Sequence, residues 1–211
     1  MDPTTNPICP LCGSLSSNFF KEKFYSCSNC SGIFRPKHSL LDHVSERKRY
    51  ETHNNDVNDI RYQNFVSPIT TSILNEFSAE QVGLDFGAGT GPVISKILAD
   101  NGYNIKQYDP FFHNFPELLK NQYDYIACCE VIEHFYDPLK EFKLLKSLLK
   151  TKGVLFCMTA IYDSSIDFAK WFYKDDPTHV FIYQKETLEW IQINVGFSKI
   201  IIENKLIKFY V

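Results

Sequence analysis

The sequence predicts an α/β protein with a mostly parallel sheet, preceded by a small cysteine-rich unit. From residue 81 onward, apolar runs alternate with amphipathic stretches, which is typical of strand–helix–strand units. A glycine-rich stretch at residues 87–91 joins the first apolar run to the first helical stretch, and two Cys-x-x-Cys pairs stand within the first 30 residues. We therefore expect three parts: a metal ribbon over residues 1–37, a helical connector or lid over 38–80 and an α/β core over 81–211.

Composition limits the class of protein. The 211 residues have room for one medium domain and a small appendage. With 44% hydrophobic residues the chain can fill a core, which excludes a disordered or collagen-like protein. A net charge of −3 argues against a protein that mainly coats nucleic acid. Residues 1–6 lack the pattern of a signal peptide, and no apolar run approaches the ~18 residues of a membrane helix. We expect a cytoplasmic protein that does not enter a membrane, and its oligomeric state stays open.

Four of the seven cysteines form the two Cys-x-x-Cys pairs: Cys9, Cys12, Cys27 and Cys30. Each pair can turn tightly enough to direct two thiolates at one ion, and two pairs complete a closed shell of four thiolates. A closed shell is structural, so we expect a zinc ribbon whose metal supplies much of its folding energy. The alternatives are a set of redox thiols or a decayed site that no longer binds zinc. The remaining cysteines lie in apolar stretches and are expected in the core: Cys128, Cys129 and Cys157.

Residues 1–50 carry an excess of basic side chains. They contain seven Lys or Arg against four Asp or Glu, a local balance of three positive charges. Such an excess could attract an anionic partner. It could also be an ordinary solvated face, which the scattered positions favour.

Residues 38–80 contain no glycine and are expected to be mainly helical. Ile69, Ile73 and Phe77 recur at helical spacing, and a polar turn at residues 53–56 separates an earlier helical stretch from a later one. These helices could cover a pocket as a lid, or their aromatic side chains could simply pack the connector. The side chains concerned are Tyr50, His53, Tyr62 and Phe65.

The strand predicted at residues 82–86 runs into the glycine-rich loop at 87–91, and Pro92 then begins a helix. Glycines at such a turn let the backbone approach a ligand and place helix N-terminal amides against it. A dinucleotide fingerprint would need its third glycine at the position of Pro92, so NAD is disfavoured. The next strand, predicted over residues 104–110, carries Asp109 about twenty residues after the loop. A carboxylate at this position can accept hydrogen bonds from both ribose hydroxyls of a bound nucleoside or nucleotide.

The string Leu84-Asp85-Phe86-Gly87-Ala88-Gly89-Thr90-Gly91 closely resembles the first motif of class I S-adenosylmethionine-dependent methyltransferases. The resemblance covers residues 81–211. It implies a Rossmann-like methyltransferase sheet, in which the loop wraps the methionine end of S-adenosylmethionine. The candidate cofactor-binding residues are Asp85, Gly87, Ala88, Gly89, Thr90, Gly91, Asp109 and Cys129.

The chain departs from this family after the second strand. Only 12 residues, 111–122, precede the next apolar run at 123–129, which is short for a helix plus a strand. We therefore expect the third of the family's seven strands, an edge strand, to be missing or vestigial, which leaves the adenine pocket unassigned. An amphipathic helix is predicted at 139–149 and a strand at 154–161. Residues 196–202 and 206–211 are expected to form the antiparallel pair that ends this fold.

Two carboxylates and a histidine follow the apolar run at 123–129. If this string turns helically, Glu130, Glu133 and His134 stand at i, i+3 and i+4, share one face and make a metal half-site. A second histidine, His179, follows the fifth strand, on the carboxyl-end rim where ligands of open α/β sheets collect.

The Glu-x-x-Glu-His string resembles that of the ubiquinone-biosynthesis O-methyltransferases and, with a distant histidine, that of plant-type small-RNA 2′-O-methyltransferases. The resemblance implies that Glu130, Glu133, His134 and His179 are catalytic and bind a divalent ion beside the acceptor oxygen. Such an ion would lower the pKa of the acceptor hydroxyl and orient it. The alternative is a site without metal, in which these residues cap a helix or line the pocket and His134 or His179 acts as a general base.

These observations together predict an enzyme, an S-adenosylmethionine-dependent methyltransferase with a zinc ribbon. We expect O-methylation of a small molecule, with a second divalent cation as a possible cofactor. The alternatives are an RNA or protein acceptor without metal, or a non-catalytic zinc-ribbon binding module with a degenerate core. The intact loop and Asp109 argue against a degenerate core.

Overall fold

The structure is a computed structural model that describes residues 6–52 and 55–211. Residues 1–5, on which part of the expectation about a signal peptide rests, lie outside the described residues, and so do His53 and Asn54 of the polar turn predicted at 53–56. Within the described ranges, no helix combines the length and the apolar character that a membrane crossing requires.

The larger of two sheets has six strands in the order β5-β4-β6-β7-β10-β9. The first four are parallel, and β10 runs antiparallel to both β7 and β9. The strands are β4 (Val82–Phe86), β5 (Asn104–Tyr108), β6 (Tyr123–Cys129), β7 (Leu149–Met158), β9 (Lys199–Glu203) and β10 (Leu206–Tyr210). The Rossmann-like sheet with a terminal antiparallel pair is therefore confirmed, although β5 stops just before Asp109 and β7 begins five residues earlier than predicted.

The third strand of the family is missing, as predicted. Between β5 and β6 the described chain forms one isolated bridge, between Asp109 and His113, and the short 3-10 helix η2 (Pro116–Lys120), so β5 is the edge of the sheet. Twelve residues suffice to cross from one strand to the next through this single turn, but they leave no length for an added strand and helix.

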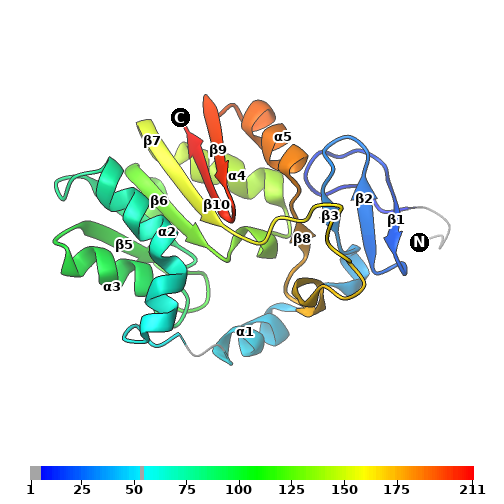
Figure 1. Cartoon of the computed structure of the whole chain (residues 1–211), viewed down its shortest axis with the longest axis horizontal. Coiled ribbons are helices and arrows are strands. Elements are labelled where there is room, and N and C mark those ends of the chain that lie inside the picture. The colour runs from blue at the N-terminus through cyan, green and yellow to red at the C-terminus, as the bar shows by residue number, and fades with distance from the viewer. Residues whose placement is uncertain (1–5, 53–54) are drawn as a thin grey trace.

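Helices cover both faces of this sheet. α2 (Ile60–Glu76) and α3 (Val93–Asp100) pack on one face, where they share an apolar cluster with Tyr125 and Phe156. α4 (Pro138–Ser147) and α5 (Lys185–Val195) pack on the other, with Ile126 and Leu155. The alternation along β6 and β7 is that of strands buried on both sides. Figure 1 shows α2 in front of the sheet and α4 behind it.

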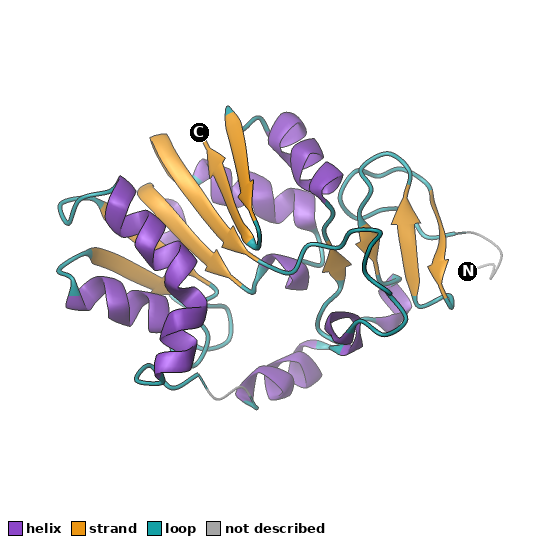
Figure 2. Ribbon diagram, in the orientation of Figure 1, coloured by secondary structure: helices purple, strands orange, loops and turns teal. Residues whose placement is uncertain are grey.

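A second, antiparallel sheet of four strands lies beside the first, in the order β1-β2-β3-β8 (Figure 2). β1 (Ser16–Phe20), β2 (Phe24–Cys27) and β3 (Ile33–Phe34) belong to the cysteine-rich unit. β8 (Phe181–Ile182) comes from far along the chain and pairs with β3. The ribbon expected within residues 1–37 is thus completed by a strand that lies in the predicted core region.

The connector is helical, as its spacing indicates. It contains the 3-10 helix η1 (Lys37–Ser39), α1 (His43–Glu51) and then α2, whose buried face includes Ile69 and Ile73. Two further 3-10 helices, η3 (Ile132–His134) and η4 (Phe172–Asp175), follow β6 and β7. Both carry side chains of the site described next.

Candidate functional site

The glycine-rich loop after β4 has a backbone that favours glycine at two positions. Gly87 and Gly89 have φ angles of 80° and 62°, in the left-handed region that disfavours other residues. A Cβ atom on Gly87 would lie 2.4 Å from a methyl group of Val131, and one on Gly91 would lie 1.7 Å from the carbonyl oxygen of Asn55. The loop is therefore packed against Val131, which precedes η3, and against the connector, and loop residues 87–90 line a cavity.

Asp109, at the end of β5, organises this loop. Its Oδ2 atom accepts a hydrogen bond from the Gly89 amide at 3.0 Å, and its Oδ1 atom accepts from the amides of Phe111 and Phe112. Asp85 takes a different place: its buried carboxylate accepts a hydrogen bond from Ser95 at 2.7 Å and does not line the cavity. Burial raises the pKa of Asp85 to about 6. Asp85 thus ties β4 to α3 beneath the loop.

A cavity of about 780 Å³ brings most of the predicted site residues together. Loop residues 87–90, Asp109 and Cys129 line one part of it, and Glu130, His134 and His179 line another. The connector closes one side through His43, Glu46, Tyr50, Tyr62 and Phe65. Of the two possibilities for these aromatic side chains, lining a pocket is therefore observed for Tyr50, Tyr62 and Phe65.

Glu133, His134 and His179 form a cluster at this cavity. Each offers one ligand atom, and these atoms all lie within 4.8 Å of one another. The Nδ1 atom of His134 lies 2.8 Å from the Thr178 carbonyl oxygen, and that of His179 lies 2.7 Å from the Tyr173 carbonyl oxygen. Because a carbonyl oxygen only accepts, both rings carry their proton on Nδ1, and in the neutral rings Nε2 holds the lone pair. This arrangement is typical of metal-binding histidines.

The environment keeps the His179 ring neutral. Burial, followed by the neighbouring His134, lowers the pKa of His179 to about 4. A neutral imidazole can bind a metal ion or accept a proton, so His179 is competent for either role.

Glu133 is fully buried behind the cavity wall and is held by two hydroxyl groups. Tyr173 donates to its Oε1 atom at 2.7 Å, and Thr159 donates to its Oε2 atom at 3.0 Å. The sequence analysis identified neither Tyr173 nor Thr159. Tyr173 lies in η4 and Thr159 directly follows β7, and no sequence spacing connects either residue to Glu133, 40 and 26 residues away.

Glu130 does not join the cluster, and the predicted geometry of its string is wrong. Instead of a regular helical turn, Glu130 has a left-handed φ of 50° and precedes the 3-10 helix η3. The i, i+3, i+4 face therefore does not form. One carboxylate oxygen of Glu130 is buried without a hydrogen-bond partner among the described residues. Burial and the nearby Glu133 carboxylate raise the pKa of Glu130 to about 8.

The four ribbon cysteines form a second cluster, which consists of thiols alone. Their sulfur atoms lie within 4.8 Å of one another, with Cys9 and Cys30 at 3.6 Å and Cys12 and Cys27 at 3.3 Å. None forms a disulfide. Hydrogen bonding from Cys30 lowers the pKa of Cys9 to about 6, which favours a thiolate. Cys128 and Cys157 are buried in the core, as expected.

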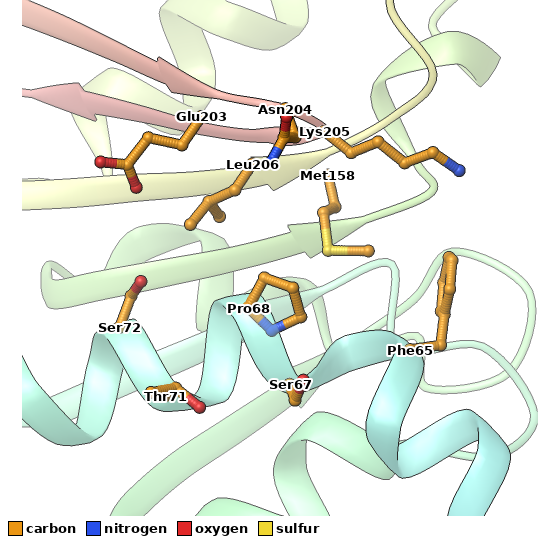
Figure 3. Close-up of a pocket in the computed structure, with 10 residues that line it drawn as sticks. All are labelled: Phe65, Ser67, Pro68, Thr71, Ser72, Met158, Glu203, Asn204, Lys205 and Leu206. Carbon is orange, nitrogen blue, oxygen red and sulfur yellow. The ribbon is translucent and has the colours of Figure 1, made fainter.

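A separate open groove of about 560 Å³ lies between α2 and the turn that joins β9 to β10. Figure 3 shows Ser67, Thr71 and Ser72 on the α2 side and Met158 and Leu206 on the sheet side. Phe65 lines both this groove and the large cavity, so its ring lies between them. The groove contains none of the predicted site residues.

The sequence is similar to known methyltransferases. Residues 59–201 match a family model described as a methyltransferase domain. A ubiquinone biosynthesis O-methyltransferase of Actinobacillus pleuropneumoniae is 28% identical over 137 residues, which cover 61% of this chain and 57% of that protein. The match thus spans little more than half the length of that relative.

Solved structures show the same fold. An S-adenosylmethionine-dependent methyltransferase from Archaeoglobus fulgidus superposes with a TM-score of 0.53 at 19% identity, covering 77% of each chain. An O-methyltransferase family protein from Burkholderia thailandensis gives 0.51 at 10% identity, covering 78% of this chain and 61% of that one. The family model covers well over half of the chain, including the glycine-rich loop and the cluster at the cavity. This chain therefore belongs to the methyltransferase domain family and has the fold of S-adenosylmethionine-dependent methyltransferases.

Proposed function

We propose that this protein transfers a methyl group from S-adenosylmethionine to a hydroxyl group of a small molecule. The observation that carries the proposal is one cavity that holds both the glycine-rich loop with Asp109 and the polar residues Glu130, His134 and His179. The name of the relative from Actinobacillus pleuropneumoniae supports a small-molecule hydroxyl as the acceptor.

At the cofactor end, the loop and Asp109 act together. The narrow turn through Gly87 and Gly89 lets backbone amides approach the methionine portion of the cofactor. Asp109 fixes that turn through the Gly89 amide. A carboxylate can accept about four hydrogen bonds. Three backbone amides already donate to Asp109, so one acceptor position remains for a ribose hydroxyl of the cofactor. This refines the expectation that Asp109 accepts from both hydroxyls.

At the acceptor end, the required step is an in-line displacement. S-adenosylmethionine, when bound, supplies a methyl group already activated by a positive sulfur. Held by the glycine-rich loop and Asp109, the cofactor would give this methyl group to the acceptor oxygen and keep the electron pair of the broken carbon–sulfur bond on sulfur, while the acceptor would lose its proton. The protein has to orient the acceptor and assist the loss of that proton. Without a metal ion at the site, the lone pair on Nε2 of His179, which lines the cavity, would accept that proton. With an ion bound, the same lone pair would hold the ion instead.

We further infer that a divalent cation binds Glu133, His134 and His179 and lowers the pKa of the acceptor hydroxyl. The close ligand atoms and the Nδ1 hydrogen bonds to backbone carbonyls fit such an ion. Two imidazoles and one carboxylate suit Mn²⁺, Fe²⁺ or Zn²⁺ better than Mg²⁺.

The ribbon cysteines fit a structural zinc ion. Four sulfurs at about 2.3 Å from one zinc lie about 3.8 Å apart in a tetrahedron. The observed separations of 3.6 Å and 3.3 Å are close to this value and much longer than a disulfide bond.

The decisive test follows the label of methyl-tritiated S-adenosylmethionine into a cell extract separated into small-molecule, RNA and protein fractions. We expect label in the small-molecule fraction, at an oxygen atom. The matched control is Gly87→Val, whose side chain would meet Val131 and distort the loop. Label only in RNA or protein would refute the small-molecule acceptor. If the wild-type protein binds neither S-adenosylmethionine nor S-adenosylhomocysteine in calorimetry, the proposal that it is an S-adenosylmethionine-dependent enzyme is wrong.

A further inference from the structure

One segment, residues 173–183, contacts every member of the cluster at the cavity. Tyr173 contributes twice: its hydroxyl donates to Glu133, and its carbonyl oxygen accepts from Nδ1 of His179. The ring of Tyr173 also lies against that of His179, with centroids 4.0 Å apart. The position of His179 is thus set by its own segment.

The same segment holds the η3 turn that carries the other two members. The Thr178 carbonyl oxygen accepts from Nδ1 of His134, and the Val180 amide donates to the Glu133 carbonyl oxygen at 2.9 Å. The Tyr183 hydroxyl donates to the Ile132 carbonyl oxygen at 2.8 Å. A displacement of residues 173–183 would therefore move all three ligand side chains together.

The ribbon in turn holds this segment. β3 pairs with β8, so that Ile33 lies opposite Ile182 and Phe34 opposite Phe181. The Phe34 and Phe181 rings stack with centroids 6.3 Å apart. A Cβ atom at Gly32 would lie 2.3 Å from the Phe181 ring, so the ribbon backbone sits directly on this strand.

Arg35, the residue after β3, extends the contact to the loop that carries His179. Its amide donates to the Val180 carbonyl oxygen at 2.9 Å. Its guanidinium donates to three further carbonyl oxygens, those of Lys174 at 2.7 Å, His179 at 3.1 Å and Asp176 at 3.3 Å. The side chain lies over the Phe24 ring of β2, 4.5 Å from its centroid. A planar group with five fixed donors suits three carbonyls in this arrangement better than an ammonium, whose three donors sit on one flexible point charge.

We infer that the cysteine ribbon is the support of the acceptor end of the active site, and that Arg35 is a positioning residue that fixes His179. The consequence for methyl transfer rests on the proposed function, but the structural claim does not. The inference also gives a role to part of the basic excess in residues 1–50, because Arg35 faces inward onto backbone oxygens rather than outward to an anionic partner.

The test compares Arg35→Ala and Arg35→Lys with Lys23→Ala, an exposed ribbon position. The full chain is labelled with ¹⁵N-histidine, and the ring signals of His179 are assigned with His179→Gln. In Arg35→Ala we expect a shifted or broadened His179 signal, an unchanged metal content at the four cysteines and a kcat reduced ~10-fold or more, as is typical for loss of a supporting hydrogen bond. KM for S-adenosylmethionine should not change. Lys23→Ala should resemble wild type.

Arg35→Lys keeps the positive charge but loses the planar guanidinium and its fixed N–H donors. We therefore expect a displacement of the His179 signal that is intermediate between wild type and Arg35→Ala. It also carries the test if Arg35→Ala does not fold. An unchanged His179 signal in the folded Arg35 variants would overturn the inference. So would a change that occurs only together with loss of the cysteine-bound metal, because that would mean a general loosening of the ribbon. Absence of methyl transfer by wild type would refute the proposed function alone, since the His179 signal still reports the positioning.

Discussion

The two clusters of potential metal ligands differ in how the chain assembles them. The four cysteines come from two short turns separated by one hairpin, and each turn contributes a complete pair. Glu133 and His134 lie in a 3-10 turn after β6, whereas His179 comes from a loop 45 residues later. A cluster made of local turns is encoded in residue spacing, while a cluster made across a sheet depends on every element that brings its parts together.

Glu130 illustrates this difference. Sequence spacing placed it with Glu133 and His134, but spacing indicates a shared face only if the backbone is helical. The backbone at Glu130 is left-handed rather than helical, Glu130 is not among the clustered ligand residues, and its neighbour Val131 packs against Gly87.

The clusters are nevertheless joined, because β8 completes the ribbon sheet and immediately follows the loop that carries His179. Two of the three parts expected from the sequence, residues 1–37 and 81–211, therefore share one sheet. The experiments below test this connection, in order of decreasing effect.

The largest effect is expected from Cys27→Ser. Removing one thiolate should release the ribbon metal, whose binding is worth roughly 10–16 kcal/mol in small zinc domains, and unfold β1 to β3. Because β8 then loses its partner strand, methyl transfer should disappear as well. Zinc content, circular dichroism and turnover measure the three consequences.

The control for Cys27→Ser is Ser28→Ala, an exposed position in the same turn, which should retain zinc and turnover. Calorimetry with S-adenosylhomocysteine should still detect binding in Cys27→Ser, because the contacts that fix the glycine-rich loop come from Asp109, Val131 and Asn55, which all lie outside residues 1–37. Normal turnover in zinc-free Cys27→Ser protein would show that the two clusters are independent after all.

His179→Ala should lower kcat by about 10²- to 10⁴-fold, the usual contribution of a group that assists proton transfer. The ribbon zinc and the affinity for S-adenosylhomocysteine should be unchanged, because His179 touches neither the cysteines nor the loop. Single-turnover kinetics with elemental analysis checks this expectation, with the exposed His38→Ala as the control. Equal kcat values for His179→Ala and wild type would remove His179 from the reaction.

Glu133→Gln and Glu130→Gln separate the observed cluster from the one predicted by spacing. We expect Glu133→Gln to weaken Mn²⁺ binding ~10- to 100-fold, since Glu133 is a ligand candidate held by Tyr173 and Thr159. Glu130→Gln should change Mn²⁺ binding little. Titration calorimetry on protein whose cysteines already carry zinc measures both affinities, and equal losses would restore the four-residue ligand set.

Much of the fold could be predicted from sequence because its signals are local. The loop at 87–91 and the strand before it occur within ten residues, and the missing strand follows from the short interval at 111–122. β8 could not be predicted, since two residues carry no periodicity and their partner strand lies about 150 residues earlier. The same applies to the roles of Arg35 and Tyr173, which depend on contacts with backbone carbonyls and on a buried carboxylate, and neither has a sequence signature.

The smallest effect is expected at Arg49 of α1, the second support of the segment 173–183. Its guanidinium lies 2.7 Å from the Asp176 carboxylate, with 39% of the Arg49 side chain and 14% of the Asp176 side chain exposed. A partly exposed pair of this kind contributes ~1 kcal/mol or less, and salt screens it. A double-mutant cycle with Arg49→Gln and Asp176→Asn in urea unfolding should give a coupling of this size, which falls in about 0.5 M NaCl. Arg35 differs because its hydrogen bonds go to backbone oxygens, so its effect should be larger and less sensitive to salt. A coupling of ~3 kcal/mol or more for Arg49 and Asp176 would instead make α1, and not the ribbon, the main support of His179.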